Sequence, residues 1–285
     1  MSPQPTQLPL EVAVFSGANA IQAQNQGAHR VELNAPGSYL RGGLTPPVDE
    51  LTSVSPWLKI PLRIMIRPVG APLESTTGRG RGDFMYIPAE FDAMKRSIAA
   101  FKATGAMDVL RGDGFVFGIL TTAPTEHTER DARARVRVDV PRCTELVKLA
   151  SPFPCVFHRA FDPIADTELL HQGLRDLSAC GFDGLLTAGG AGPSHEAHLQ
   201  RLDGMAFYIE MHRELRDLQL VVGGGVRAHN ADRAVAKLGT HKHGRVWLHS
   251  ACLARNPAGG GAAGENVDDV ELRNLISRLE LARVD

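Results

Sequence analysis

The sequence has 285 residues, of which 43% are hydrophobic and 22% are charged, an ordinary balance for a globular protein. Its formal net charge of −1 excludes recognition of nucleic acid or of an acidic membrane through bulk charge. No apolar run approaches transmembrane length and residues 1–10 lack the apolar segment of a secretory signal, so we expect a cytoplasmic protein without a membrane partner.

Eight short apolar, β-branched runs predict strands. They span residues 10–15, 30–34, 62–67, 114–120, 155–161, 184–187, 218–222 and 245–250. Amphipathic stretches at 18–26, 89–103, 143–149, 167–179, 231–238 and 271–281 predict helices, most of them followed by glycine. Strand and helix alternate along the chain, which is typical of right-handed βαβ units. Eight such units predict a single α/β domain, a (β/α)₈ TIM barrel, with its core at about residues 10–253.

Three segments depart from this alternation. Residues 71–82 and 121–138 follow the third and fourth strands and have the composition of insertions. Loops after barrel strands lie on the catalytic face, so these two are either lids or passive surface loops. Residues 256–266 are rich in Gly and Ala and predict a linker before a C-terminal helix at 268–283.

The fifth predicted strand ends in ionisable residues, with His158, Arg159 and Asp162 within five positions. Because strand side chains alternate between two faces, His158, Ala160 and Asp162 are expected on one face. Arg159 is expected on the other face unless a bulge turns it inward. A strand that is apolar at its start and charged at its end is typical of one that delivers side chains to a pocket.

Other strand ends add to this set. Glu32 on the second strand and Arg67 on the third alternate with apolar neighbours, so they are expected to point into the barrel. The candidate catalytic residues are therefore Glu32, Arg67, His158 and Asp162. The alternative is a buried ion pair, such as Glu32 with Arg67, that only fixes the barrel interior.

Two glycine-rich groups follow the sixth and seventh strands and form a candidate anion site. Their residues are Thr187, Gly189, Gly190, Gly223, Gly224 and Gly225. Glycine lets backbone N–H groups approach an anion, and barrels often bind phosphate after strands seven and eight. The alternative is that these glycines only allow tight turns.

Metal-ligand signals are weak. The four cysteines are scattered and form no C-x-x-C pair, which indicates free thiols in a reduced compartment. His249 and Cys252, three residues apart, are the only metal candidates, and surface histidines are the alternative.

Several motifs together resemble the CutC family of copper-homeostasis proteins. They are Gly27-Ala28-His29-Arg30-Val31-Glu32-Leu33, Gly42-Gly43-Leu44-Thr45-Pro46, Met65-Ile66-Arg67-Pro68, Gly82-Asp83-Phe84-Met85-Tyr86, Gly114-Phe115-Val116-Phe117-Gly118, the fifth-strand run, Leu186-Thr187-Ala188-Gly189-Gly190 and Gly223-Gly224-Gly225. The resemblance covers about residues 10–253. It implies one barrel, cytoplasmic and self-associating as a dimer or tetramer, with a role in copper tolerance and no firmly attached reaction.

The sequence departs from this family at two kinds of position. Family members often carry cysteine where this chain has Ala13 and Asn34, and Cu(I) prefers thiolate ligands. The family's His-x-Ser-Ala reads Leu248-His249-Ser250-Ala251 here, so the imidazole is displaced by one position. Copper is thus implied by resemblance only.

These observations predict a polar pocket at the carboxyl end of the barrel that binds a small anionic or hydroxylated metabolite. Arg67 and the glycine groups would hold the charge, and His158 and Glu32 would transfer protons, with Asp162 orienting His158. Hydrolysis, isomerisation and simple binding are all compatible with this set. A metal-buffering protein without catalysis and an inactive barrel used as a scaffold are the other hypotheses.

Overall fold

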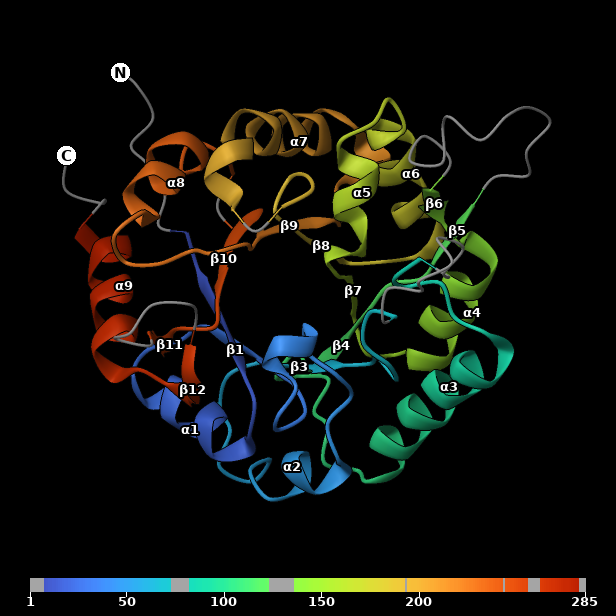
Figure 1. The fold of residues 1–285 in the computed structure, drawn as a ribbon, viewed down its shortest axis with the longest axis horizontal. Coiled ribbons are helices and arrows are strands. Elements are labelled where there is room, and N and C mark those ends of the chain that lie inside the picture. Colours follow the sequence, from blue (N-terminus) through green and yellow to red (C-terminus); the bar gives the residue numbers. More distant parts are fainter. Residues whose placement is uncertain are drawn as a thin grey trace.

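The computed structural model describes residues 8–72, 82–122, 136–192, 194–242, 244–255 and 262–281. Eight parallel strands close into one barrel in the order β1-β10-β9-β8-β7-β4-β3-β2 (Figure 1). They are β1 (Leu10–Val14), β2 (Arg30–Leu33), β3 (Leu62–Met65), β4 (Gly114–Phe117), β7 (Cys155–Phe157), β8 (Gly184–Thr187), β9 (Gln219–Val222) and β10 (Val246–Ser250). The predicted (β/α)₈ barrel is confirmed, with a strand at each of the eight predicted places.

The strands pack on both faces because their side chains alternate. Outward residues such as Val12, Ile64 and Phe115 belong to one continuous core between the barrel and the helices. Inward apolar residues form a separate cluster inside the barrel, which consists of Met65, Val116, Val156, Leu186 and Val221 with Trp247 against it. This inner apolar layer is small, so polar side chains fill the rest of the barrel interior.

Helices surround the barrel (Figure 1). They are α1 (Gly17–Asn25), α2 (Val48–Thr52), α3 (Pro88–Ala103), α4 (Val140–Ala150), α5 (Asp162–Ala165), α6 (Leu170–Cys180), α7 (Leu199–Met211), α8 (Ala231–Leu238) and α9 (Asp269–Leu281). The sequence prediction missed α7, whose buried Leu202, Met205 and Ile209 follow helical spacing. None of the helices in the described ranges is long and apolar enough to span a membrane.

The fifth barrel strand is shorter than predicted. β7 ends at Phe157, a 3₁₀ helix follows at Arg159–Phe161, and Asp162 begins α5. His158 caps that 3₁₀ helix, because its ring nitrogen Nδ1 accepts a hydrogen bond from the backbone N–H of Ala160 at 3.3 Å. The expected alternation of His158, Ala160 and Asp162 on one strand face is therefore wrong, since the chain turns before it can apply.

Two antiparallel hairpins lie outside the barrel. β5 (Leu120–Thr122) pairs with β6 (Val136–Val138) at the ends of the predicted insertion, while residues 123–135 lie outside the described residues. β11 (Leu253–Arg255) pairs with β12 (Ala262–Val267). The expected linker at 256–266 is wrong for its second half, because β12 finds a hydrogen-bonding partner in β11; residues 256–261 lie outside the described residues. Most of the insertion at 71–82 also lies outside them.

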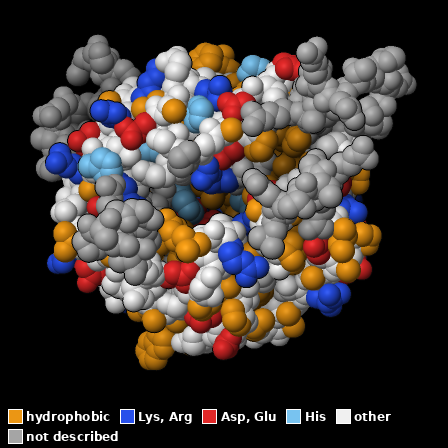
Figure 2. All heavy atoms as spheres, viewed as in Figure 1, with side chains coloured by type: hydrophobic (Ala, Val, Ile, Leu, Met, Phe, Trp, Pro, Cys, Tyr) orange, Lys and Arg blue, Asp and Glu red, His pale blue; other side chains and the backbone are white. Residues whose placement is uncertain are grey.

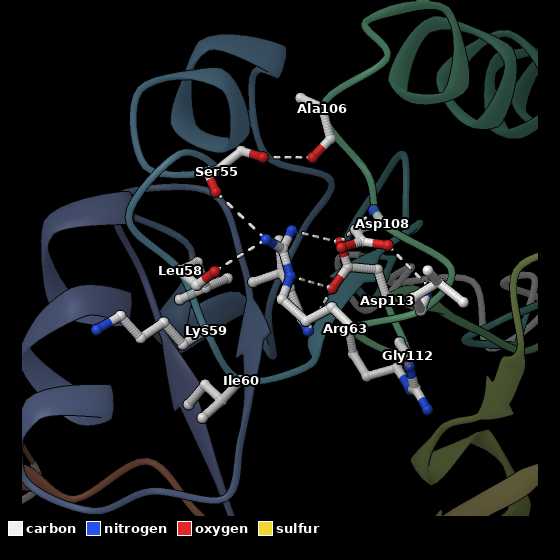
Figure 3. Close-up of polar contacts among 12 residues, drawn as sticks. Ser55, Leu58, Lys59, Ile60, Arg63, Ala106, Asp108, Gly112 and Asp113 are labelled. Atoms are coloured by element: carbon white, nitrogen blue, oxygen red, sulfur yellow. Dashed lines mark hydrogen bonds and ion pairs between the residues drawn. The ribbon is translucent and has the colours of Figure 1, made fainter.

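A buried carboxylate, Asp113, lies at the amino end of the barrel, directly before β4 (Figure 3). It accepts hydrogen bonds from the backbone N–H groups of Leu62 at 3.0 Å and Asp108 at 2.9 Å. The guanidinium of Arg111 adds an ion pair at 2.6 Å. A buried carboxylate with this many donors is well satisfied, and the contacts tie the starts of β3 and β4 together. This end is therefore structural, and a site is expected at the opposite, carboxyl end.

Candidate functional site

Four charged side chains from three neighbouring strands meet inside the barrel. Glu11 lies on β1, Arg30 and Glu32 on β2, and His249 on β10. The strand register pairs Glu11 with both Arg30 and His249. Arg30 and Glu11 form an ion pair in which both side chains are 2% exposed. The polar interior expected from alternation is therefore present, and Glu11 and Arg30 are members that the sequence pattern did not single out.

Arg30 fixes Glu11 from one side. Its Nη1 donates to Oε1 of Gln219 at 3.2 Å, and its guanidinium lies 4.1 Å from the ring centre of Trp247. Burial raises the pKa of Glu11, but the charge of Arg30 and the hydrogen bond from His249 outweigh it and bring the pKa to about 2. Glu11 is therefore a fixed anion below the pocket.

His249 is held by the other oxygen of this carboxylate. Its Nδ1 lies 2.8 Å from Oε1 of Glu11. Burial alone would lower the pKa of His249, but the charges of Glu32 and Glu11 overcome this and raise it. A carboxylate bound at Nδ1 fixes the ring orientation and leaves Nε2 for a second partner.

Glu32 is buried, and only one of its two carboxylate oxygens has a hydrogen-bond partner among the described residues. Its Oε1 accepts from Nδ2 of Asn34 at 3.1 Å, whereas no hydrogen-bond partner is found for its Oε2 among the described residues. Burial raises the pKa of Glu32, with a further contribution from the charge of Glu11. An unpaired buried carboxylate oxygen is costly, so this atom is suited to exchange a proton or to meet a ligand.

Glu32 and His249 line a cavity of about 200 Å³ at the carboxyl end of the barrel. Its other polar lining side chains are Asn34, Tyr39, Arg159, Arg227 and Ser250. Figure 2 shows a hollow in the middle of this face of the molecule, bordered by basic, acidic and histidine side chains. The cavity is large enough for a small metabolite only.

Arg67 does not reach Glu32. Its Nη2 binds both oxygens of Asp83, at 3.1 and 3.0 Å, and its Nη1 donates to the backbone oxygen of Arg41 at 2.7 Å. The guanidinium also packs over the ring of Phe84 at 4.7 Å. The alternative Glu32–Arg67 ion pair is therefore wrong. Arg67 holds the loops after β2 and β3 together, and its charge is neutralised by Asp83.

His158 and Asp162 do not meet either. Burial, followed by the charge of Arg67, lowers the pKa of His158 to about 3, so its ring is neutral. Asp162 accepts from Oγ1 of Thr187 at 2.6 Å and from Nε of Arg159 at 2.8 Å. The prediction that Asp162 orients His158 is wrong, because both Asp162 oxygens are used by the loop after β8 and by Arg159.

The first glycine group is occupied by the protein's own oxygens. The backbone N–H of Ala188 donates to Asp162 at 2.9 Å, that of Gly189 to Oγ1 of Thr187 at 2.9 Å, and that of Ala191 to Asp166 at 2.6 Å. These three donors have acceptors already, and Gly190, for whose N–H no acceptor is found among the described residues, does not line the cavity, so this group is not part of the cavity site. Gly189, with φ of 83°, supplies the turn.

The second glycine group borders the cavity. Gly224 and Gly225 have φ of 90° and 71°, a conformation that other residues rarely adopt, and both line the cavity with Arg227. Nη1 of Arg227 donates to Oγ of Ser250 at 2.9 Å. The candidate anion site is thus reduced to the loop after β9, with Arg227 as a member that was not predicted.

One group of potential metal ligands is found among the described residues. One ligand atom from each of Glu11, Glu32 and His249 lies within 4.8 Å of the other two. The weak candidate Cys252 is not part of it, since its thiol is buried and bonded to Ser250. His249 was predicted only as a weak ligand. Its partner Glu11 could have been found from the alternation of the first strand, which places Glu11 on the inward face.

Comparison with known proteins now decides the family. The model of the CutC family matches residues 8–247. The chain belongs to the CutC family. The copper homeostasis protein cutC homolog of Mus musculus is 32% identical over 90% of this chain and 77% of its own length. A CutC family protein of Chromobacterium violaceum is 33% identical over 90% of this chain and 89% of its own length.

A solved CutC structure agrees with the fold. The crystal structure of CutC from Streptococcus agalactiae superposes with a TM-score of 0.65 at 22% identity, covering 86% of this chain and 98% of that one. This likeness concerns the barrel itself. The family resemblance indicated by the motifs is confirmed by the match of the family model over residues 8–247.

The residues present in this CutC member do not fit a thiolate copper site. Positions 13 and 34, where the resemblance implies cysteine, line the cavity but carry Ala13 and Asn34. The four cysteines of the chain, Cys143, Cys155, Cys180 and Cys252, are all buried and free, and burial raises their pKa values. Buried thiols that stay protonated are poor Cu(I) ligands, because the metal binds the thiolate.

Proposed function

We propose that this CutC-family protein binds a small anionic metabolite in the barrel cavity and transfers protons to or from it. The observation that carries the proposal is the Glu11–His249–Glu32 arrangement at the cavity wall. Glu11 orients His249 through Nδ1, and Glu32 has an unpaired oxygen beside it. Burial raises the pKa of Glu32, and despite burial the charges of the two carboxylates raise that of His249, so a carboxyl group and an imidazole that can each give or take a proton lie side by side at the cavity wall.

The roles of the candidates predicted from the sequence change accordingly. His249 replaces His158 as the partner of Glu32, and Glu11 replaces Asp162 as the group that orients the imidazole. In this arrangement His249 and Glu32 exchange a proton with the bound ligand, while Glu11 and Arg30 keep the imidazole aligned. The proposal covers isomerisation and hydrolysis, since both require a proton donor and acceptor.

The test is deuterium exchange from solvent, which reports removal of a carbon-bound proton even when no net product forms, while hydrolysis would be seen in the same spectra as new product signals. The protein is incubated in deuterium oxide with a panel of small carboxylates, hydroxy acids and phosphate monoesters, and deuterium uptake is followed by proton NMR. We expect wild-type protein to label one class of compound, and Glu32→Gln and His249→Gln to slow this by about 100-fold or more.

Matched controls separate chemistry from folding. Glu145→Gln and His171→Gln change the same residue types on the surface and should keep the wild-type rate. Labelling that persists unchanged in both Glu32→Gln and His249→Gln would contradict the proposal. Labelling lost in the surface controls would indicate a general effect on the fold.

A divalent-metal site on Glu11, Glu32 and His249 is the second candidate function, favoured by the 4.8 Å grouping of their ligand atoms and by the copper-homeostasis names of the relatives. Oxygen and imidazole ligands suit Cu(II) or Zn²⁺ better than Cu(I). Titration of the reduced protein with Cu(I), Cu(II) and Zn²⁺ against a competing chelator discriminates between the candidates. Stoichiometric binding lost in His249→Gln and Glu32→Gln would favour the metal site over the acid–base pair.

Copper tolerance, cytoplasmic location and self-association as a dimer or tetramer stay predictions from the family resemblance. Light scattering of the purified protein and a copper-sensitivity assay of a deletion strain would address them directly. A strain complemented equally by wild type and by Glu32→Gln would favour the scaffold hypothesis.

A further inference from the structure

The loop after β9 presents backbone donors to the cavity. Among the described residues no acceptor is found for the N–H groups of Gly224 and Gly225, nor for that of Ala251 after β10. All three residues line the cavity. This differs from the first glycine group, in which the N–H groups of Ala188, Gly189 and Ala191 are bonded to the protein's own oxygens.

His195 fixes the orientation of these donors. The backbone N–H of His195 donates to the backbone oxygen of Gly224 at 2.9 Å. The ring Nδ1 of His195 lies 2.8 Å from the same oxygen. In a trans peptide the C=O and N–H groups point in opposite directions. Holding the Gly224 oxygen against the buried His195 therefore turns the N–H of Gly225 away from His195. His195 thus acts as a positioning residue for this loop.

Arg227 supplies a positive charge that nothing nearby neutralises. In the part of the chain that the structure describes, no carboxylate lies within ion-pair distance of it. Among the described residues, its Nη1 donates to Oγ of Ser250 at 2.9 Å and to the backbone oxygen of Val226 at 3.5 Å. Arg159, the other arginine at the cavity, is paired with Asp162 at 2.8 Å. Arg227 is therefore the charge available to a ligand.

We propose that the N–H groups of Gly224, Gly225 and Ala251, together with the guanidinium of Arg227, bind the phosphate group of a small phosphate monoester. The donors come from two loops and from a side chain, which suits a tetrahedral group with three terminal oxygens better than a planar carboxylate. The subsite lies in the same cavity as Glu32 and His249. Phosphate monoesters thereby become the expected substrate class of the proposed function. Phosphate binding itself does not depend on that function, whereas proton transfer on the remainder of the ligand does.

The experiment measures binding of inorganic phosphate, so it needs no turnover. Calorimetric titration at constant ionic strength should show saturable phosphate binding and much weaker binding of acetate and chloride. Arg227→Ala should weaken phosphate binding by about 10- to 100-fold, as expected for a charge-assisted contact. Arg216→Ala removes an arginine that is 62% exposed and paired with Asp217, and it should leave the affinity unchanged.

A second measurement uses the unmodified protein. In a nitrogen–proton NMR titration, the amide signals of Gly224, Gly225 and Ala251 should shift with phosphate, whereas those of Gly189 and Ala191 should not. Equal shifts in both loops, equal affinities for all anions, or an affinity unchanged by Arg227→Ala would overturn the subsite. Such a result would leave the deuterium-exchange test of the proposed function intact, because that test can succeed with a carboxylate ligand.

Discussion

Glu11, on the first strand of the barrel, and His249, on the last, are joined by a hydrogen bond of 2.8 Å between Oε1 and Nδ1. The bond spans the seam at which the barrel closes, since β1 pairs with β10 and the two residues lie opposite each other. Closing the barrel therefore also assembles the candidate acid–base site. Substitutions at these two positions and at the surrounding residues can test this link.

The pKa of His249 should depend on Glu11. The fold raises this pKa above 6.5, so the protonated ring stabilises the folded state fully below pH 6.5, and this contribution is lost as pH rises through the folded-state pKa. In Glu11→Gln, the pKa of His249 should fall. The difference in unfolding free energy between wild type and His249→Asn should likewise shrink from pH 6 to pH 9. Imidazole NMR titration and denaturant unfolding measure both quantities, and a pKa unmoved by Glu11→Gln would contradict the link.

Glu11 should also govern acid stability. Its pKa falls from 4.5 to about 2 on folding, so its stabilising contribution is present above pH 4.5 and is lost as pH falls toward 2. Replacing one member of a buried ion pair leaves the other charge unpaired, and Arg30→Met should cost about 3–5 kcal/mol at neutral pH. Urea unfolding at pH 7 and pH 3 would measure this. A cost that is the same at both pH values would argue against ionised Glu11 as the partner.

Arg67 should prove structural. It binds Asp83 through two hydrogen bonds and also binds the backbone oxygen of Arg41, so Arg67→Met should cost about 1.5–3 kcal/mol of unfolding free energy, less than for a fully buried pair because Asp83 is 32% exposed. Asp83→Asn should weaken the same contacts without removing the guanidinium. If Arg67→Met kept wild-type stability but lost phosphate binding, Arg67 would be a ligand residue after all. Calorimetric titration of the same variants with phosphate provides that comparison.

Replacing the imidazole of His158 should leave proton transfer to the ligand unchanged. Its ring is neutral and packs against Phe84 at 4.7 Å between ring centres, and its Nδ1 only caps the 3₁₀ helix. We expect His158→Gln to cost about 1 kcal/mol, the usual effect of losing such a cap, and to keep deuterium exchange at the wild-type rate. An exchange rate reduced as strongly as in His249→Gln would restore His158 as a catalytic residue.

The thiols should be unreactive in the folded protein. Burial raises the pKa of Cys252 to about 11, and the other three cysteines are buried as well. Since the thiolate is the reactive form, labelling by a thiol reagent at pH 8 should be slow until denaturant unfolds the chain. Rapid labelling of one thiol, located by mass spectrometry, would indicate an accessible cysteine and reopen the question of Cu(I) binding.

The sequence by itself determined the barrel, because strand and helix periodicities are local properties and each strand carries its own inward and outward face. It also indicated that Glu32 points inward, because Glu32 alternates with the apolar Val31 and Leu33, which must face the helices. The prediction for the fifth strand was wrong at the point where a local cap ended it: the backbone N–H of Ala160 binds the His158 ring, and the chain leaves the sheet after Phe157.

Only the tertiary structure decided which polar residues meet. Arg67 pairs with Asp83 in place of Glu32, Asp162 binds Thr187, and Glu11 joins His249 across 238 positions of sequence. Such pairings depend on barrel closure and on the stagger between strands, which a single sequence does not encode locally. The same holds for the two glycine groups, which look alike in sequence. They differ in the fold because carboxylate and hydroxyl oxygens accept from the N–H groups of Ala188, Gly189 and Ala191, whereas Gly224 and Gly225 line the cavity and no acceptor is found for their N–H groups among the described residues.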